Sequence, residues 1–170
     1  RWDLARAGQH RPNISLIGTP ERRRLAEHLF HRFAACAAPR LATLPHSVIY
    51  ADANDENVLV EGNRVTGLLD FGDALEAPTV CELAIALVYA MLDREHPLED
   101  GAEIVAGYHA ERPLLADELA VLVPLICGRL AASVTIAAER RRIDPANANW
   151  FVTEDRAWRL ILALAAVDPA

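Results

Sequence analysis

The chain has 170 residues, of which 17 are Arg, none is Lys and 24 are acidic, so its formal net charge is -7. A hydrophobic share of 52% is enough for one packed domain and excludes a disordered, collagen-like or disulfide-scaffolded chain. The acidic balance argues against nucleic acid as a partner, because neutralising phosphates needs a basic face. It favours a small cationic partner instead.

Three cysteines stand far apart in the sequence. Cys36, Cys81 and Cys127 each lie in an apolar stretch, and no Cys-x-x-Cys pair occurs. This usage predicts three buried thiols in a reducing, cytoplasmic compartment, rather than disulfides or metal ligands.

One segment, residues 119–138, is long and apolar enough to cross a membrane. Arg129 lies near its middle, and Pro124 and Gly128 interrupt it. A central Arg costs about 2.5 to 3.5 kcal/mol even on lenient insertion scales. We therefore expect a buried core helix and no membrane partner.

The first 40 residues contain one predicted helix. Residues 1–18 show weak periodicity and several breakers, which predict a loop with at most a helical turn. Thr19-Pro20-Glu21 then supplies a capping side chain, a first-turn proline and an early acid, and apolar residues follow at intervals of four. We expect an amphipathic helix that ends near Pro39.

Strand patterns follow between residues 48 and 69. Apolar and β-branched runs cover 48–50, 58–60 and 65–69, and a turn at 61–64 separates the last two. This pattern predicts one small antiparallel unit.

The rest of the chain is predicted to be helical. Thr79 and Glu82 have the spacing of a capping box for a helix over 80–92, and further helices are expected at 99–109 and 117–141. Thr153 is predicted to cap a last helix that ends near Val167. The expected class is α+β and mainly helical, a single domain over 1–170 with strands at 48–73 and a helical subdomain at 79–167.

Polar residues flank the predicted hairpin on both sides. Asp52 and Asn57 precede its first strand, and Asp70 follows its second. With a two-residue turn in the middle of 61–64, Asn57 lies opposite Leu68, and Asp70 is two residues further along the same face. Diagonal neighbours on one face are about 7 to 8 Å apart between Cα atoms.

This spacing lets an amide oxygen and a carboxylate share one cation. Oxygen ligands without nearby His or Cys suit magnesium better than zinc or copper. Because Asp52 lies in the loop that leads into the first strand, its carboxylate can face the same pocket without being needed as a ligand. The alternative is that Asn54, Asp55 and Glu56 form only a solvated turn and that Asp70 only ends a strand.

The two segments together resemble a known family. Asp52-Ala53-Asn54-Asp55-x-Asn57-Val58-Leu59-Val60 and Leu69-Asp70-Phe71-Gly72-Asp73 are similar to motifs of the aminoglycoside phosphotransferase and choline kinase family. The likeness is strongest to the hydroxylysine-kinase-like branch, which in bacteria also occurs fused to class III aminotransferases. The resemblance implies the C-terminal lobe of a protein-kinase-like fold.

The resemblance also implies roles for individual residues. Asp52 becomes the base that accepts the proton of a substrate hydroxyl, and Asn57 and Asp70 become the Mg²⁺ ligands that hold the phosphates of ATP or GTP. The implied acceptor is a small amine, amino alcohol or aminoglycoside-like compound. Asp73 would be a supporting group. Because the net charge favours a cationic acceptor, we expect its ammonium group to be bound by acids near the mouth of the site, for which Asp55, Glu56, Asp73 and Glu76 are available.

Two residues depart from the family pattern. Tyr50 stands where the family usually has a His that holds the loop, and Ala51 replaces a Gly. Because Tyr can still donate a hydrogen bond, we expect a perturbed loop that can still form. Glu82 stands where many relatives have an Asp that supports the loop, although a capping box explains it equally well.

The family also has an N-terminal lobe with a Gly-rich loop and a Lys that contacts the nucleotide, and this chain has no Lys. We expect the lobe, or a fused enzyme domain, to be supplied by the parent polypeptide, and the isolated chain to be inactive. Two other classes stay open. One is a degenerate module that binds a metabolite or regulates an attached enzyme such as an aminotransferase. The other is a metal-dependent phosphohydrolase that uses Asp52 and Asp70.

Overall fold

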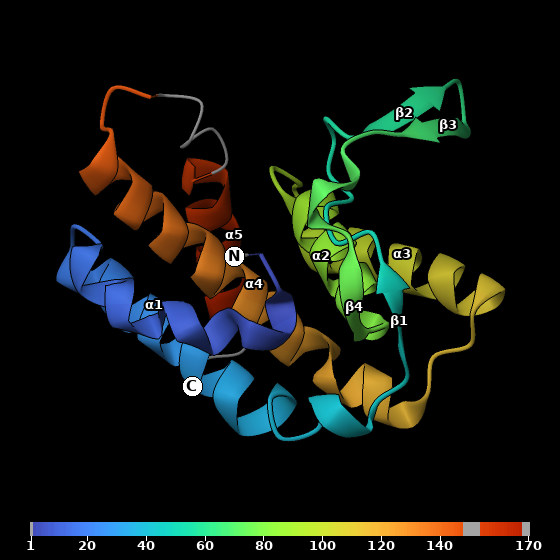
Figure 1. The fold of residues 1–170 in the computed structure, drawn as a ribbon, viewed down its shortest axis with the longest axis horizontal. Helices are drawn as coiled ribbons and strands as arrows, with labels where there is room; N and C mark the ends of the chain where they lie inside the picture. Colours follow the sequence, from blue (N-terminus) through green and yellow to red (C-terminus); the bar gives the residue numbers. More distant parts are fainter. Residues whose placement is uncertain (1, 148–153, 168–170) are drawn as a thin grey trace.

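The computed structural model describes residues 2–147 and 154–167 (Figure 1). Helices dominate it, and short strands occupy the middle of the chain, as expected for the α+β class. The helical segments are η1 (Leu4–Leu16), α1 (Pro20–Arg32), η2 (Phe33–Ala37), η3 (Leu41–Thr43), η4 (Phe71–Asp73), α2 (Val80–Met91), α3 (Pro97–Glu111), α4 (Ala116–Ile143) and α5 (Glu154–Val167). The strands are β1 (His46–Ile49), β2 (Val58–Glu61), β3 (Arg64–Leu68) and β4 (Leu75–Pro78).

Helix α4 is the centre of the hydrophobic core. It packs against η1, α1 and η2 on one side and against α2 on the other (Figure 1). Among the helices in the described ranges, α4 is the one whose length and apolar composition would allow it to cross a membrane, and 78% of its most apolar window is buried within the protein. Its apolar side chains therefore serve here as those of a core helix.

The N-terminal segment is the first correction to the sequence prediction. Residues 4–16 form a 3-10 helix rather than a loop. The Asp3 carboxylate accepts a hydrogen bond from the amide of Ala5, and the buried side chains are Leu4, Ala7 and His10. An interval of three residues is the period of a 3-10 helix, and a search for the α-helical period misses it.

The strands form two separate pairs rather than one unit. β1 pairs with β4, with Ser47 opposite Ala77, and β2 pairs with β3. The predicted strand 48–50 was wrong in its bounds, because β1 ends at Ile49 and its partner β4 was not expected. The β2–β3 hairpin stands away from the helices (Figure 1), whereas β4 runs directly into α2, and Ser47 of β1 bonds to Thr79, the residue before α2.

The predicted hairpin register was wrong by one residue at its open end. Near the turn Glu61 pairs with Arg64, as expected, but an irregularity between Leu59 and Val60 shifts the pairing, so that Val58 lies opposite Leu68. A bulge places an extra residue in one strand and changes which residues face each other beyond it. Asn57 is therefore beside Leu69, whose amide donates to the Asn57 carbonyl at 2.9 Å.

Most helix bounds match the prediction to within a few residues. The Thr19 hydroxyl accepts from the amide of Arg22, as predicted for the first residue before α1. Thr153, predicted to cap the last helix, lies outside the described residues. Cys81 and Cys127 are buried as expected, but Cys36 is exposed, whereas Phe33 and Ala37 are the buried residues of the same helical turn, η2.

Candidate functional site

The loop over residues 50–57 connects β1 to β2 and is fixed at its start by α2. Ala51 is buried and has a φ of 67°, a left-handed conformation that costs a residue with a side chain about 1 to 2 kcal/mol. Its amide donates to the Glu82 carboxylate at 2.8 Å. The capping-box prediction for Thr79 and Glu82 was wrong, because the Thr79 hydroxyl bonds to that of Ser47.

Asp52 follows immediately and lies half-buried among groups from three elements. The side-chain amide of Asn57 donates to its Oδ2 at 2.7 Å. The hydroxyl of Tyr89, on α2, lies 3.5 Å from its Oδ1. Arg129, on α4, donates to that Tyr89 hydroxyl at 2.8 Å and lies 3.8 Å from Oδ1. The carboxylate is thereby fixed in one orientation.

The electrostatic environment raises the pKa of the Asp52 carboxyl. Burial is the main cause, and the negative charge of Asp73 adds to it, while the hydrogen bond from Asn54, the charge of Arg129 and the hydrogen bond from Asn57 act in the opposite direction. A carboxylate with a raised pKa holds a proton more strongly. Asp52 is therefore suited to accept one from a neighbouring hydroxyl.

Tyr50 connects this loop to the segment over residues 69–73, which follows the hairpin. Its hydroxyl donates to the Leu69 carbonyl, and its ring packs edge-on against Phe71, with centroids 5.1 Å apart. Burial, and then the negative charges of Asp52 and Asp70, raise the pKa of Tyr50, so it stays a proton donor at neutral pH. The structure thus shows Tyr50 linking the two segments through its hydroxyl.

Asp70 begins the second segment in an exposed position. Its φ is 52°, and its Oδ1 accepts from the amide of Gly72 at 3.1 Å. The side-chain nitrogen of Asn57 points to Asp52, with bonds to both its carbonyl and its carboxylate. The Asn57 side-chain oxygen and the Asp70 carboxylate are oxygen donors of the kind that Mg²⁺ prefers.

The described residues contain no group of three or more His, Cys, Asp and Glu that could hold a metal by themselves. One amide oxygen and one carboxylate nevertheless fit Mg²⁺, because this ion is often bound by one or two protein ligands together with phosphates and water. The donor set of Asn57 and Asp70 is consistent with that arrangement.

A cavity of about 490 Å³ adjoins Asp52. Asp55, Glu56 and Asp73 also line it, whereas Tyr50, Asn57 and Asp70 are not among its lining residues. The facing walls come from α2, α4 and α5. The site therefore has two parts, the oxygen donors of Asn57 and Asp70 and a cavity that Asp52 borders.

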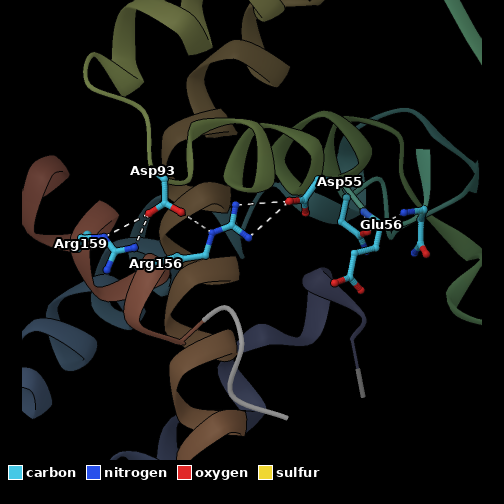
Figure 2. A network of polar contacts seen from close by, with 7 residues as sticks. Asp55, Glu56, Asp93, Arg156 and Arg159 are labelled. Carbon is cyan, nitrogen blue, oxygen red and sulfur yellow. Dashed lines mark hydrogen bonds and ion pairs between the residues drawn. The ribbon is translucent and has the colours of Figure 1, made fainter. Parts of the chain in front are cut away.

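Arg156 connects helix α5 to the loop over residues 50–57 (Figure 2). Arg156 donates to Asp93 at 2.7 Å and to Asp55 at 3.5 Å, and Arg159 donates to Asp93 as well. Asp55 is therefore directed toward α5, while the Glu56 carboxylate in Figure 2 points away from this network.

Sequence reasoning did not identify Tyr89, Arg129 or Arg156 as site residues. The sequence did contain a sign of the role of Arg129, because a single Arg in an apolar stretch, once buried, needs a partner that offsets its charge. Arg129 is 2% exposed. Its charged partner, Asp52, is 77 residues away in the sequence, so sequence patterns could not identify this pair.

Comparisons with known proteins find one matching family and two groups of similar proteins. The model of the phosphotransferase enzyme family matches residues 3–119. The hydroxylysine kinase of Mus musculus is 28% identical over 168 residues, which are 93% of this chain and 45% of that protein. The hydroxylysine kinase of Xenopus laevis is 25% identical, over 96% of this chain and 46% of that protein.

A second group of relatives matches a shorter part. The homoserine kinase of Zymomonas mobilis is 38% identical over 87 residues, which are 50% of this chain and 27% of that protein. The chain spans less than half the length of the curated relatives it matches. No solved structure matches it significantly.

Proposed function

The chain belongs to the phosphotransferase enzyme family, and we propose that it is the catalytic lobe of a kinase that phosphorylates a hydroxyl group of a small amine or amino acid. Its relatives are small-molecule kinases, for hydroxylysine and for homoserine. The single observation that supports a catalytic role best is the half-buried Asp52, bonded to Asn57 at 2.7 Å, at the border of a cavity large enough for such a molecule.

The proposed reaction is an in-line transfer of the γ-phosphoryl group from ATP or GTP. As the acceptor oxygen forms its bond to phosphorus, its proton passes to Asp52 and the bond to the β-phosphate oxygen breaks. Tyr89 and Arg129 orient the Asp52 carboxylate for this step. Asn57 and Asp70 would hold Mg²⁺, which would neutralise charge on the phosphates.

We further propose that another part of the parent polypeptide covers the hairpin side of this lobe and carries the main nucleotide contacts. Apolar side chains are exposed there, with Val60 at 60%, Val65 at 64% and Phe71 at 62%. Exposed apolar surface of this kind is typical of interaction sites. A fused enzyme domain such as an aminotransferase is the alternative occupant.

The direct test measures nucleoside diphosphate release by the full-length protein with Mg²⁺ and ATP or GTP. The acceptor panel contains hydroxylysine, homoserine, choline, ethanolamine and aminoglycosides. Turnover that depends on one acceptor supports the proposal. No turnover with any acceptor supports the degenerate module, and cleavage of phosphate esters without nucleotide supports a phosphohydrolase.

The metal part of the proposal has its own test. Asp70→Ala removes one of the two proposed protein ligands, so Mg²⁺-dependent nucleotide binding should weaken at least about tenfold, as expected for loss of a charged ligand. Unchanged affinity in a titration would remove Asp70 from the site. Glu61→Gln, which removes a charge at the tip of the hairpin, is the control.

A further inference from the structure

We infer that Arg156, on α5, is a positioning residue: anchored on Asp93, it holds Asp55 and, with it, the loop that carries the proposed base. The inference rests on the proposed function, because the loop matters to the reaction through Asp52. It gives α5 a part in the site that the motifs of residues 50–73 do not include. The argument comes from the two edges of one guanidinium group.

Asp93 anchors Arg156 from the loop that follows α2. Both of its carboxylate oxygens are occupied: Oδ2 accepts from Nε of Arg156 at 2.7 Å, and Oδ1 accepts from Nε of Arg159 at 3.2 Å (Figure 2). Hydrogen bonds between two charged groups are roughly twice as strong as those between neutral groups. One edge of the Arg156 guanidinium is therefore held independently of the loop of the site.

The other edge of the same guanidinium faces that loop. Its terminal nitrogens, Nη1 and Nη2, both lie 3.5 Å from Oδ2 of Asp55 (Figure 2). Because a guanidinium is planar and rigid, the bond from Nε to Asp93 also sets the direction in which Nη1 and Nη2 point. The shorter contact is on the side of Asp93 and the longer one is on the side of Asp55. Helix α5 is thus the part that holds, and the loop is the part that is held.

Asp55 lies in a turn that contains both the proposed metal ligand and a support for the base. The side-chain oxygen of Asn54 accepts from the amides of Glu56 and Asn57, at 2.8 and 2.9 Å. The Asn57 side chain donates to the carboxylate of Asp52 at 2.7 Å. These bonds set the shape of the turn but do not set its place against the helices. A displacement at Asp55 would therefore pass to Asn57 and to the proposed base.

The loop is attached to other elements at its two ends and at its tip. Its start is fixed by the bond from the Ala51 amide to Glu82 at 2.8 Å, and its end by the bond from the Leu69 amide to the Asn57 carbonyl at 2.9 Å. Arg156 adds an attachment at the tip. A misplacement of reacting groups by about 1 Å can slow a reaction about 10²-fold, so this attachment bears on the rate.

The contact with Arg156 also changes the role expected for Asp55. The sequence makes Asp55 one of the acids available to bind a substrate ammonium group, but in the structure its carboxylate pairs with a guanidinium that Asp93 holds in place. The two roles differ in their kinetics. Loss of an interaction that binds the substrate in every state raises KM, whereas a displaced base lowers kcat.

The test measures amide hydrogen exchange over residues 52–58 of the full-length protein, in peptides and without nucleotide or acceptor. Exchange of hydrogen-bonded amides reports how often a segment opens. Arg156→Gln should make exchange here about two- to fivefold faster, as expected for the loss of one partly exposed ion pair. Unchanged exchange would overturn the inference. The amides that donate within this segment are those of Asn54, Glu56, Asn57 and Val58.

Arg159→Gln is the matched control. Arg159 lies on the same helix and donates to the same carboxylate of Asp93, so its loss weakens the attachment of α5 in a comparable way. Ala157 and Trp158 stay buried in the core, which keeps α5 in place in both variants. We expect Arg159→Gln to leave exchange in the loop unchanged. Equal acceleration in the two variants would mean that the loop responds only to the packing of α5, which contradicts the inference.

Asp55→Ala breaks the same contact from the side of the loop. The Asp55 side chain is 61% exposed, so this variant is expected to fold even if Arg156→Gln does not. It should accelerate exchange by the same factor as Arg156→Gln, and the double variant should go no further, because both changes remove one interaction. Additive effects would show that the two residues act separately and would refute the inference.

Kinetics of the full-length protein decide between the two roles of Asp55. Arg156→Gln and Asp55→Ala should each lower kcat about threefold or more, by similar factors and with KM within about twofold of the parent value. Arg159→Gln should leave both constants unchanged. A rise in KM confined to Asp55→Ala, with kcat unchanged, would assign Asp55 to the substrate and refute the inference.

Exchange and turnover together separate this inference from the proposed function. Faster exchange in the Arg156 and Asp55 variants of a protein that transfers no phosphoryl group would retain the positioning of the loop and refute the kinase. Turnover by a protein whose loop exchanges at the same rate in every variant would retain the kinase and refute the inference.

Discussion

A buried Arg next to a half-buried Asp is the central feature at the scale of single residues. Arg129 is 2% exposed, and such a charge is tolerated only when partners offset its desolvation. The partners are the Asp52 carboxylate, the Tyr89 hydroxyl and the Trp2 ring. The same contacts that make Arg129 tolerable in the core also fix the proposed base.

Tyr89→Phe tests this arrangement. The variant removes the hydroxyl that accepts from Arg129 and leaves that donor without its partner in a buried place. Loss of a buried hydrogen bond of this kind costs about 1 to 3 kcal/mol. We expect the free energy of unfolding, measured in denaturant, to fall by this amount, and an unchanged value would mean that the hydroxyl contributes nothing to holding Arg129.

The cysteines allow a simple chemical prediction. Burial raises the pKa of Cys81 to about 12, so its reactive thiolate is scarce at neutral pH. Cys127 is also buried, whereas Cys36 is exposed. Brief treatment of the folded protein with iodoacetamide at pH 7.5 (about one unit below an ordinary thiol pKa) should label Cys36 alone in mass spectra. Labelling of Cys81 at a comparable rate would contradict the described packing.

How far the sequence predicts the site differs between residues. Asp52 and Asn57 are five positions apart in one loop, so a local motif could propose their contact, and the structure shows it. Tyr89 and Arg129 come from helices that approach the loop only after the core has packed. The roles assigned to Asp52, Asn57 and Asp70 stay predictions until they are tested in solution.

At the scale of elements, a close approach joins α4 to the N-terminal helices. A Cβ placed on Gly128 would lie 2.5 Å from the Phe33 ring. Phe33 is buried, at the point where α1 passes into η2. Gly128 therefore permits the contact between these helices, which the sequence alone presented only as an interruption of an apolar run.

Gly128→Ala should accordingly destabilise the protein, although Ala is the better helix former. Inserting a methyl group into a packed core typically costs about 1 to 3 kcal/mol. Gly107→Ala in α3 is the matched control, because a Cβ there meets nothing within 4 Å, and it should stabilise by about 0.5 to 1 kcal/mol. The two melting temperatures should move in opposite directions. A rise in both would show that the Phe33 contact is loose.

The elements that sequence patterns predicted well are those with a helical period and a clear end signal. Helix α1 begins after Thr19, as expected, and α2 to α4 match within a few residues. The 3-10 helix η1 repeats every three residues instead of every 3.6, so a search for the α-helical period misses it. Strand β4 has only four residues and ends in Pro78, so it gives no clear strand pattern. The hairpin register failed because a bulge changes the pairing without leaving a distinctive residue in the sequence.

At the scale of the whole molecule, ion pairs connect α5 to the loop after α2 and to the loop of the site. Asp93 follows α2 in a left-handed conformation, with φ of 59°, and accepts from both Arg156 and Arg159. Hydrogen bonding to Arg159 is the main reason why the pKa of Asp93 lies below its ordinary value of 3.8, and Arg156 contributes after it. Arg156 also reaches Asp55 in the loop of the site.

Asp93→Asn isolates this contribution, because Asn tolerates the left-handed conformation. A lowered pKa in the folded state means that the ion pairs stabilise above pH 3.8 and lose their effect as the pH falls through the lower folded value. At pH 7 the variant should melt at a lower temperature than the parent protein, and the difference should shrink below about pH 4. A difference independent of pH would contradict the account; Glu95→Gln, in the same loop, is the control.

The most direct test of the central claim is the rate of phosphoryl transfer by Asp52→Asn in the full-length protein, with nucleotide affinity measured on the same sample. The account predicts a fall in kcat of about 10² to 10⁴, with Mg²⁺-nucleotide affinity within a few-fold of the parent value. Undiminished turnover would show that Asp52 is not the base, and loss of nucleotide binding would show that it is a ligand instead.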